Sequence, residues 1–395
     1  MYKLYCRIFQ FIMRCSAVFM MWRRPELLKG FQDLINLMRE KQVKSALLVT
    51  DKGLVKAGMH TELIQVLQNA GTHCALYDKT VQNPTIDNIE EALSLYKKEN
   101  CTAIVALGGG SPMDCAKGVG ARVARPRKKI SQMRGLLKVR KKMPLFVAVP
   151  TTAGTGSETT LSAVITDSAT HEKYALNDLV LIPHYALLEP RLTVGLPGFI
   201  TACTGMDALC HAVEAYIGRS NTRQTRKDAL KATELIFKNL YTAFQNGQNI
   251  SARENMQQAA FQAGAAFTRA YVGYIHAIAH TLGGQYHVQH GLANAVIMPY
   301  VLKMYGEKIY GPLSEMAAAA GIVAHGPQEG AEKFIDAIVR LNAKMGIPDK
   351  ISDLKAEDIP VLAGRAMKEA NPVYPVPVFF ERADIEKIYH QILAE

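Results

Sequence analysis

Residues 102–114 read TAIVALGGGSPMD, an apolar run followed by three glycines and then by residues typical of a helix start. A short apolar run bounded by turn residues is typical of a buried strand. Ser111 and Pro112 suit the start of a helix, because serine caps free backbone N–H groups and proline fits the first helical position. The stretch therefore predicts a strand, a tight glycine turn and a helix in succession.

Apolar runs of the same kind occur elsewhere in the first half of the chain, at residues 45–50, 74–78 and 145–150. Segments with helical patterns separate them. Strands that alternate with helices form parallel sheets, because the crossover between two parallel strands is usually a helix. We therefore predict an α/β fold with a parallel sheet in the N-terminal half.

The second half of the chain has a different pattern. From about Pro197 onward apolar residues recur at helical spacing, over residues 201–219, 226–244, 252–269 and 328–345. A chain of 395 residues also exceeds the size of a single hydrophobic core. The predicted organisation is an amphipathic segment at residues 1–25, a parallel-sheet domain at 26–196 and an all-helical domain at 197–395.

The composition is that of an ordinary globular protein, with 49% hydrophobic and 21% charged residues. The seven cysteines include no C-x-x-C pair, and their number is odd. This usage predicts neither a disulfide framework nor a zinc ribbon, and it favours a reducing compartment such as the cytoplasm.

The formal net charge is +11, and much of it lies in residues 122–142, within a stretch from 115 to 157 that has no acidic residue. Charge runs usually face water, so we expect a solvated surface segment. No zinc-finger, RNP or basic-zipper pattern accompanies it, so we do not expect nucleic acid as a partner.

The glycine turn at 108–110 places free backbone N–H groups at the start of a helix. Such a site suits a pyrophosphate, because the N–H groups and the positive end of the helix dipole both attract anions. The same residues would also suit a plain connection between a strand and a helix. The G-x-G-x-x-G fingerprint of ordinary Rossmann domains is absent.

Two further polar positions follow predicted strands. Residues 150–158 read PTTAGTGSE, and Asp51 ends the first strand. Ligands of open parallel sheets bind beyond the carboxyl ends of the strands. There, Asp51 would accept hydrogen bonds from a ribose and repel a 2′-phosphate, which favours NAD over NADP. Alternatively, Asp51 simply begins the turn with Lys52 and Gly53.

Acidic and histidine residues gather in the helical half. Asp207 and His211 are four residues apart on one predicted helix, and His276 and His280 repeat this spacing on another. Each pair therefore shares a helix face. His290 follows ten residues later. One carboxylate with three imidazoles suits Fe²⁺ or Zn²⁺, although a single histidine more often has a structural role.

Several motifs, in this order, resemble those of the iron-containing alcohol dehydrogenases. They are GGGSPMD at 108–114, PTTAGTGSE at 150–158, GMDALCH at 205–211, HAIAHTLGG at 276–284 and HGLAN at 290–294. The resemblance covers residues 45–305. It implies the dehydroquinate synthase-like fold, with an N-terminal dinucleotide-binding domain, a helical metal-binding domain and the metal in the cleft between them.

The resemblance also implies roles for individual residues. The metal ligands would be Asp207, His211, His276 and His290. His280 would not bind the metal and would lie beside it or on the substrate side. Our own inference is that His280 is the catalytic residue that passes a proton toward solvent, because it would lie near the metal without binding it. The NAD-binding residues would be Asp51, Gly109, Gly110, Ser111, Thr151, Thr152, Thr155 and Lys173.

The activity that follows is metal-dependent transfer of a hydride between NAD(H) and a small alcohol or aldehyde. The metal would act as a Lewis acid on the substrate oxygen. One alternative is an enzyme resembling glycerol dehydrogenases or dehydroquinate synthases, and another is a non-catalytic basic binding module. The segment 371–377 departs from the family on what is its substrate side, so the particular alcohol stays open.

Residues 3–22 lie outside the resemblance and predict an amphipathic helix. Its apolar stripe would be Leu4, Ile8, Phe11, Cys15, Val18 and Trp22. Arg7 and Arg14 interrupt the apolar run, so it is too short to span a bilayer. The pattern suits weak attachment to an anionic lipid surface. Alternatively, the stripe packs on the protein itself or across the interface of an expected homo-oligomer.

Overall fold

The computed structural model describes residues 1–18, 20, 22–168 and 172–394. The chain divides into two compact units. One consists of Met21–Thr193, and the other combines Met1–Met20 with Val194–Glu395. The first twenty residues thus belong to the same unit as the C-terminal half, a grouping for which the sequence offered no indication.

The unit Met21–Thr193 is built on a six-stranded sheet with the order β1-β9-β6-β4-β2-β3, and all of its strand pairs are parallel. The strands are β1 (Glu26–Leu28), β2 (Ser45–Val49), β3 (His73–Tyr77), β4 (Ala103–Gly108), β6 (Leu145–Pro150) and β9 (Tyr185–Leu187). The predicted parallel sheet is confirmed. The predicted strands correspond to β2, β3, β4 and β6, with ends that differ by at most one residue.

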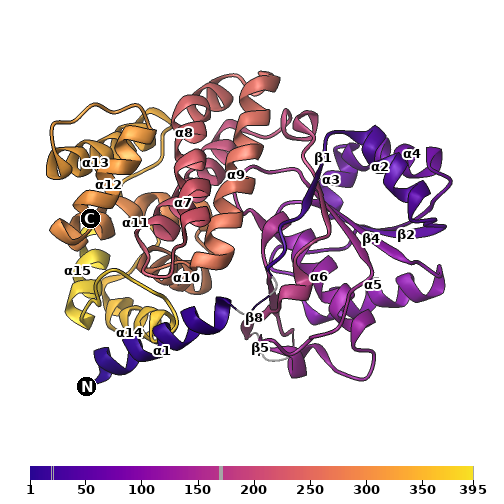
Figure 1. The fold of residues 1–395 in the computed structure, drawn as a ribbon, viewed down its shortest axis with the longest axis horizontal. Coiled ribbons are helices and arrows are strands. Elements are labelled where there is room, and N and C mark those ends of the chain that lie inside the picture. Colours follow the sequence, from indigo (N-terminus) through magenta and orange to yellow (C-terminus); the bar gives the residue numbers. More distant parts are fainter. Residues whose placement is uncertain (19, 21, 169–171, 395) are drawn as a thin grey trace. The chain divides into compact units, whose positions relative to one another are not determined.

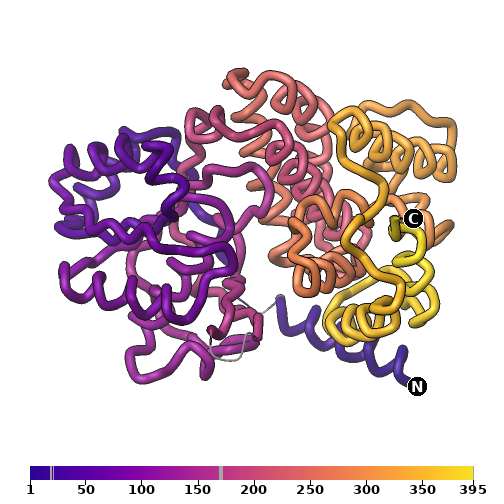
Figure 2. The backbone as a smooth tube through the Cα atoms, turned by 180° about the vertical axis from the view of Figure 1, so that it is seen from behind, coloured from indigo at the N-terminus to yellow at the C-terminus, as the bar shows by residue number. Residues whose placement is uncertain are grey.

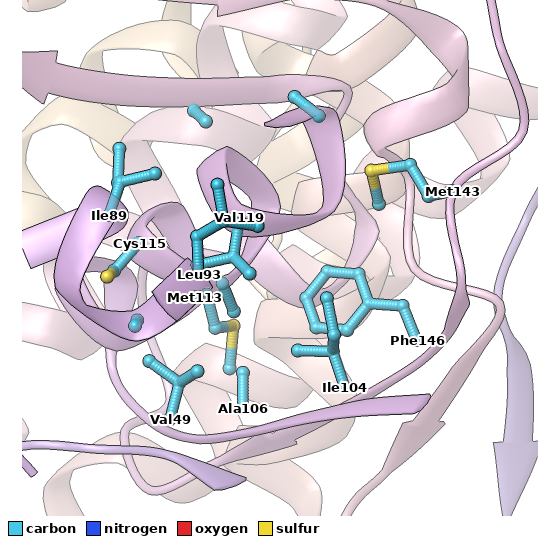
Figure 3. Packing of buried hydrophobic residues seen from close by; sticks show 14 of the residues in the cluster. Val49, Ile89, Leu93, Ile104, Ala106, Met113, Cys115, Val119, Met143 and Phe146 are labelled. Carbon is cyan, nitrogen blue, oxygen red and sulfur yellow. The ribbon is translucent and has the colours of Figure 1, made fainter. Parts of the chain in front are cut away.

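Helices cover both faces of this sheet (Figure 1). They are α2 (Phe31–Glu40), α3 (Lys52–Lys56), α4 (Met59–Asn69), α5 (Ile86–Lys98) and α6 (Gly110–Ala124). Successive strand residues point to opposite faces. Leu47 of β2 accordingly packs in one core with α5 and α6, and its neighbour Leu48 packs in the other with α2 and α4. Figure 3 shows part of the first core, to which α5 contributes Ile89, α6 contributes Val119, and β4 and β6 contribute Ile104 and Phe146.

A second, smaller sheet has the order β5-β8-β7 and was not predicted. Its strands are β5 (Gly135–Leu136), β7 (Ser162–Thr166) and β8 (Lys173–Asn177). The basic residues between α6 and β6 lie around it, and seven of them are exposed: Arg127, Lys129, Arg134, Lys138, Arg140, Lys141 and Lys142. The expectation of a solvated basic segment is therefore confirmed for most of its length.

The other unit is helical from residue 198 onward, as predicted. Its helices are α7 (Gly198–Ile217), α8 (Arg223–Gln245), α9 (Ile250–Ala270), α10 (Tyr274–Tyr286), α11 (His290–Tyr305), α12 (Tyr310–Ala319), α13 (Pro327–Lys344), α14 (Ile359–Ala370) and α15 (Arg382–Ile392). Helix α7 is buried along most of its length among α8, α9 and α11. Among the described helices, none has the length and apolar character needed to cross a membrane.

Helix α1 (Tyr2–Val18) lies beside the C-terminal helices of its own unit in both views (Figures 1 and 2). It ends at Val18, so Trp22 is not part of the helix as predicted. The predicted stripe also faces outward: Leu4 is 65% exposed and Phe11 66%. The alternative that this stripe packs on the protein itself is therefore wrong. The opposite side, with Cys6 and Gln10, is buried.

Candidate metal centre and cofactor site

Three helices bring the predicted metal ligands together. Asp207 and His211 lie one turn apart on α7, His276 lies in the first turn of α10, and His290 begins α11. One ligand atom from each of these residues lies within 4.8 Å of the other three. The first three are buried, and the side chain of His290 is 40% exposed. The structure thus groups the four residues that the sequence selected, and His280 lies outside this group.

A glycine permits the close approach of α11 to α7. A Cβ atom on Gly291 would lie 2.3 Å from the carbonyl oxygen of Cys203, which no real Cβ contact allows. Only glycine can occupy this position without moving one of the helices. The approach places His290 against Asp207, with 3.5 Å between Nε2 and Oδ1.

The electrostatics of the group suit a divalent cation. Burial, together with the three neighbouring histidines, holds the pKa of His276 well below its usual range. The neutral imidazole is the form that binds a metal ion. Asn294 donates from Nδ2 to Asp207 Oδ1 at 2.8 Å and fixes that carboxylate. One carboxylate and three imidazoles match Fe²⁺ or Zn²⁺ better than a hard cation, which prefers oxygen ligands.

Glu214 fixes the orientation of His276, and sequence reasoning missed it. Its carboxylate accepts the backbone N–H groups of Gly273 and Ile275, both at 2.8 Å, and the Nδ1–H of His276 at 2.6 Å. Burial raises the pKa of Glu214 to about 8, and the N–H donors oppose this rise. Because Nδ1 is engaged, Nε2 is left for a metal ion. The spacing of Glu214 from Asp207, seven residues along the same buried helix, could have indicated the role of Glu214 at this site.

Cys210 lies close to the same imidazole, with 3.7 Å between Sγ and His276 Nδ1. Cys210, Glu214 and His276 also have ligand atoms within 4.8 Å of one another. Burial raises the pKa of the Cys210 thiol well above its usual range, so it is not a thiolate. Since Nδ1 of His276 already donates to Glu214, this second group needs no ion to satisfy it.

The glycine turn after β4 differs in one detail from the prediction. Helix α6 begins at Gly110 with Gly109 at its N-cap, so Ser111 is not the capping residue but lies within the first turn. Gly108 has a φ of 149°, and a Cβ there would lie 2.5 Å from Cγ of Pro112. Glycine therefore lets the chain turn tightly and leaves the N–H groups of the first helical turn without intrahelical partners.

The two polar loops lie against each other at the carboxyl edge of the sheet. A Cβ on Gly109 would lie 3.3 Å from Thr152 Oγ1, and one on Gly110 would lie 3.5 Å from Thr155 Cγ2. The N–H of Thr151 donates to the carbonyl of Gly108 at 3.1 Å. These six residues therefore form one surface at the N-terminus of α6.

The remaining predicted cofactor residues border the same edge. Lys173 donates to Asn83 Oδ1 at 2.7 Å, and the N–H of Asn83 donates to Ser111 Oγ at 3.3 Å. Asp51 follows β2 and caps α3, where Oδ1 accepts the N–H of Leu54 at 2.9 Å. The turn role that was the alternative for Asp51 is therefore present, and its ribose role stays a prediction.

Comparison with known proteins decides the family. Residues 29–190 match the family model of iron-containing alcohol dehydrogenases, and residues 201–393 match the model of the C-terminal part of that family. The chain belongs to the iron-containing alcohol dehydrogenase family. The resemblance seen in the motifs, the fold class and the alcohol dehydrogenase interpretation are thus confirmed.

Individual relatives of this dehydrogenase support the same conclusion. The 1,3-propanediol dehydrogenase of Klebsiella pneumoniae is 40% identical over 335 residues, 83% of this chain and 86% of that protein. The NAD-dependent methanol dehydrogenase of Bacillus methanolicus is 39% identical over 350 residues, 84% and 88% of the two chains. A solved 1,3-propanediol oxidoreductase has a TM-score of 0.90 at 35% identity, covering 95% of this chain and 100% of that one. The enzyme is an oxidoreductase that interconverts alcohols and aldehydes with NAD and a metal.

In this dehydrogenase His280 stands beside the metal ligands and contacts an acid from another helix. Its ring centroid lies 5.2 Å from that of His290. Nδ1 lies 2.5 Å from Glu369 Oε1, and the Tyr374 hydroxyl donates to the same oxygen at 2.8 Å. Burial opposes the ionisation of Glu369, but His280 and the Tyr374 hydroxyl hold its pKa below its usual range. Sequence reasoning missed both partners, which lie about 90 residues beyond His280.

A buried lysine ties the second cofactor loop to α6 and was also missed. Lys117 Nζ donates to Ser157 O at 2.8 Å, Thr160 Oγ1 at 2.7 Å and Ser162 O at 2.8 Å. Burial lowers its pKa to about 8, while Asp114 and Glu158 act in the opposite direction. These bonds hold residues 157–162 against the helix that follows the glycine turn.

Proposed function

We propose that Asp207, His211, His276 and His290 hold one divalent ion, and that this ion is Fe²⁺, with Zn²⁺ as the alternative. The observation that supports this most directly is the grouping of the four ligand atoms within 4.8 Å. The absence of a thiolate ligand argues against the sulfur-rich sites in which structural zinc is common. Iron is preferred because the chain matches the model of iron-containing alcohol dehydrogenases. Elemental analysis of the protein after anaerobic purification tests the identity and stoichiometry of the ion.

The ion would supply Lewis-acid polarisation of the substrate oxygen. The protein's own groups would set the geometry around it. Glu214 keeps His276 in one tautomer, and Asn294 holds the Asp207 carboxylate. We assign the catalytic proton transfer to His280, whose side chain is 43% exposed while Glu369 contacts its Nδ1. Its Nε2 is therefore the atom that would exchange a proton with substrate on one side and solvent on the other.

We propose that NAD binds at the surface formed by the glycine turn and the threonine loop. The residues are Asp51, Gly109, Gly110, Ser111, Thr151, Thr152, Thr155 and Lys173. The pyrophosphate would lie on the N-terminus of α6, where backbone N–H groups and the helix dipole both favour an anion. Asp51 would face the adenosine ribose and favour NAD over NADP.

The proposed substrate is a small alcohol or its aldehyde, a class that fits the propanediol and methanol dehydrogenases among the relatives. The decisive experiment is NADH oxidation across a panel of short aldehydes and ketones after reconstitution with Fe²⁺ or Zn²⁺. Steady turnover with at least one short aldehyde is expected. A panel without steady turnover for either metal contradicts the proposal.

We also propose a cytoplasmic location, since all seven cysteines lie among the described residues and are free thiols.

The outward apolar face of α1, in a segment without an acidic residue, supports weak and salt-sensitive attachment to anionic lipid. Cosedimentation with anionic vesicles tests this: equal binding by full-length protein and a chain starting at Arg23 excludes it. Light scattering tests the expected homo-oligomer.

A further inference from the structure

The polar side of α1 binds the segment between α14 and α15. Arg7 donates from Nη1 to the carbonyl of Val376 at 2.8 Å and from Nη2 to that of Pro377 at 3.1 Å. Gln10 donates from Nε2 to the carbonyls of Pro372 and Tyr374, at 3.0 and 2.7 Å. Two side chains of α1 therefore satisfy four backbone oxygens of one short segment.

This segment depends on outside partners because of its sequence. Residues 371–377 read NPVYPVP, and the three prolines have no backbone N–H to donate. Partly buried carbonyls without regular structure need donors from elsewhere in the protein. The Arg7 guanidinium and the Gln10 amide supply them. Arg7 also lies over the Phe379 ring at 4.1 Å, which fixes its position from a second side.

The same segment leads directly to the candidate active site. The backbone of Tyr374 accepts a hydrogen bond from Gln10, and its hydroxyl donates to Glu369. Glu369 in turn contacts Nδ1 of His280 at 2.5 Å. A continuous series of hydrogen bonds thus runs from α1 through Tyr374 and Glu369 to the histidine beside the metal ligands.

A second contact of the segment reaches the other side of the site. The N–H of Arg219, just beyond the end of α7, donates to the carbonyl of Pro375 at 2.7 Å. A Cβ on Gly273 would lie 3.6 Å from Val376 Cγ1, and the N–H of Gly273 donates to Glu214. The segment therefore borders the carboxylates that orient both His276 and His280.

We propose that α1 is a positioning element of this dehydrogenase. Arg7 and Gln10 fix the backbone of residues 372–377, so that Tyr374 keeps Glu369 in place against His280. Residues 1–28 lie outside both ranges that match the family models. The inference rests on the proposed function, because His280 affects turnover only if the metal centre is the active site.

The test compares the double variant Arg7→Met/Gln10→Leu with Lys3→Met. Lys3 pairs with Glu381 on the surface of the same helix, and both partners are more than half exposed, so Lys3→Met removes a charge without touching the segment. Hydrogen exchange of the amides in residues 373–380 should accelerate in the double variant alone. Its metal content should equal that of the wild type, while kcat for aldehyde reduction falls roughly tenfold or more, as for other losses of outer-shell support.

Non-additivity gives the sharpest form of the test. If Arg7 and Gln10 act through Tyr374, adding Tyr374→Phe to the double variant should lower kcat no further than Tyr374→Phe alone does. Replacing Arg7 by Lys instead of Met in the double variant keeps a charged N–H donor at this position. This variant should therefore retain more of the wild-type kcat than Arg7→Met/Gln10→Leu does. If Tyr374→Phe lowers kcat by the same factor in the double variant as in the wild type, the proposal is overturned. Unchanged exchange in residues 373–380, unchanged kcat despite faster exchange, or loss of metal would overturn it too.

Failure of the proposed function would look different. A wild-type protein that holds no metal and oxidises no NADH would refute the metal-dependent activity. The exchange rates of residues 373–380 would still report whether α1 holds the segment.

Discussion

His276 Nδ1 lies 2.6 Å from a carboxylate oxygen of Glu214, and this contact fixes which nitrogen of the imidazole would bind a metal ion. Glu214 is itself held by two backbone N–H groups at the start of α10. Since α7 carries Asp207, His211 and Glu214 on one face, a single helix contributes two proposed ligands and orients a third.

Replacing Glu214 by Gln should weaken metal binding without unfolding the protein. The amide keeps the size of the side chain, but its NH2 group replaces one of the two oxygens that contact Gly273, Ile275 and His276. Losses of such support typically lower affinity by about 10- to 100-fold. Competition with a chelator measures the effect. Cys210→Ala is the matched control, since its thiol lies near the same nitrogen, and it should bind metal like the wild type.

His276→Ala and His290→Ala should each remove the bound metal and abolish turnover, because each deletes one of the four ligands. His280→Ala should keep the metal and lower the rate. Elemental analysis with NADH assays on the same samples separates the two classes. A metal-free His280 variant beside a metal-loaded His276 variant would overturn the assignment.

Asp51 should set the preference for NAD. Asp51→Gly is expected to narrow the gap between NADH and NADPH, because it removes the negative charge that opposes a 2′-phosphate. Asp51→Asn is the sharper variant, since asparagine keeps the N-cap of α3 while losing the charge. The ratio of kcat/KM with NADH to kcat/KM with NADPH measures this preference in the wild type and in each variant. If the wild type already uses NADPH as well as NADH, Asp51 has no such role.

Glu158 should make folding stability depend on pH. Burial raises its pKa from 4.5 to about 7, so between these values the folded protein holds a proton that the unfolded chain has lost. Stability therefore falls as the pH rises from about 4.5 to about 7, by up to about 3 kcal/mol from this group. Glu158→Gln should remove that slope. Urea unfolding of both proteins at several pH values, without cofactor, provides the comparison, and parallel curves would contradict the prediction.

The amino-acid sequence by itself determined the parallel sheet, the helical second half, the glycine turn and the family. These features depend on neighbours along the chain. Apolar runs such as residues 102–107 specify buried strands wherever they occur, and a spacing of four places Asp207 and His211 on one face of any helix. The motifs are likewise short and continuous, so they can be recognised without knowledge of the fold.

Only the tertiary structure decided which groups meet across long separations in sequence. Nothing in the sequence near His276 or His280 predicts that Glu214 and Glu369 contact them, because each pair is joined by the packing of separate helices. The orientation of α1 is a further case. Periodicity identified its two faces, but apolar periodicity favours burying Leu4 and Phe11. Proline-rich residues 371–377 instead offer backbone carbonyls that require the donors of Arg7 and Gln10, so the polar face packs inward.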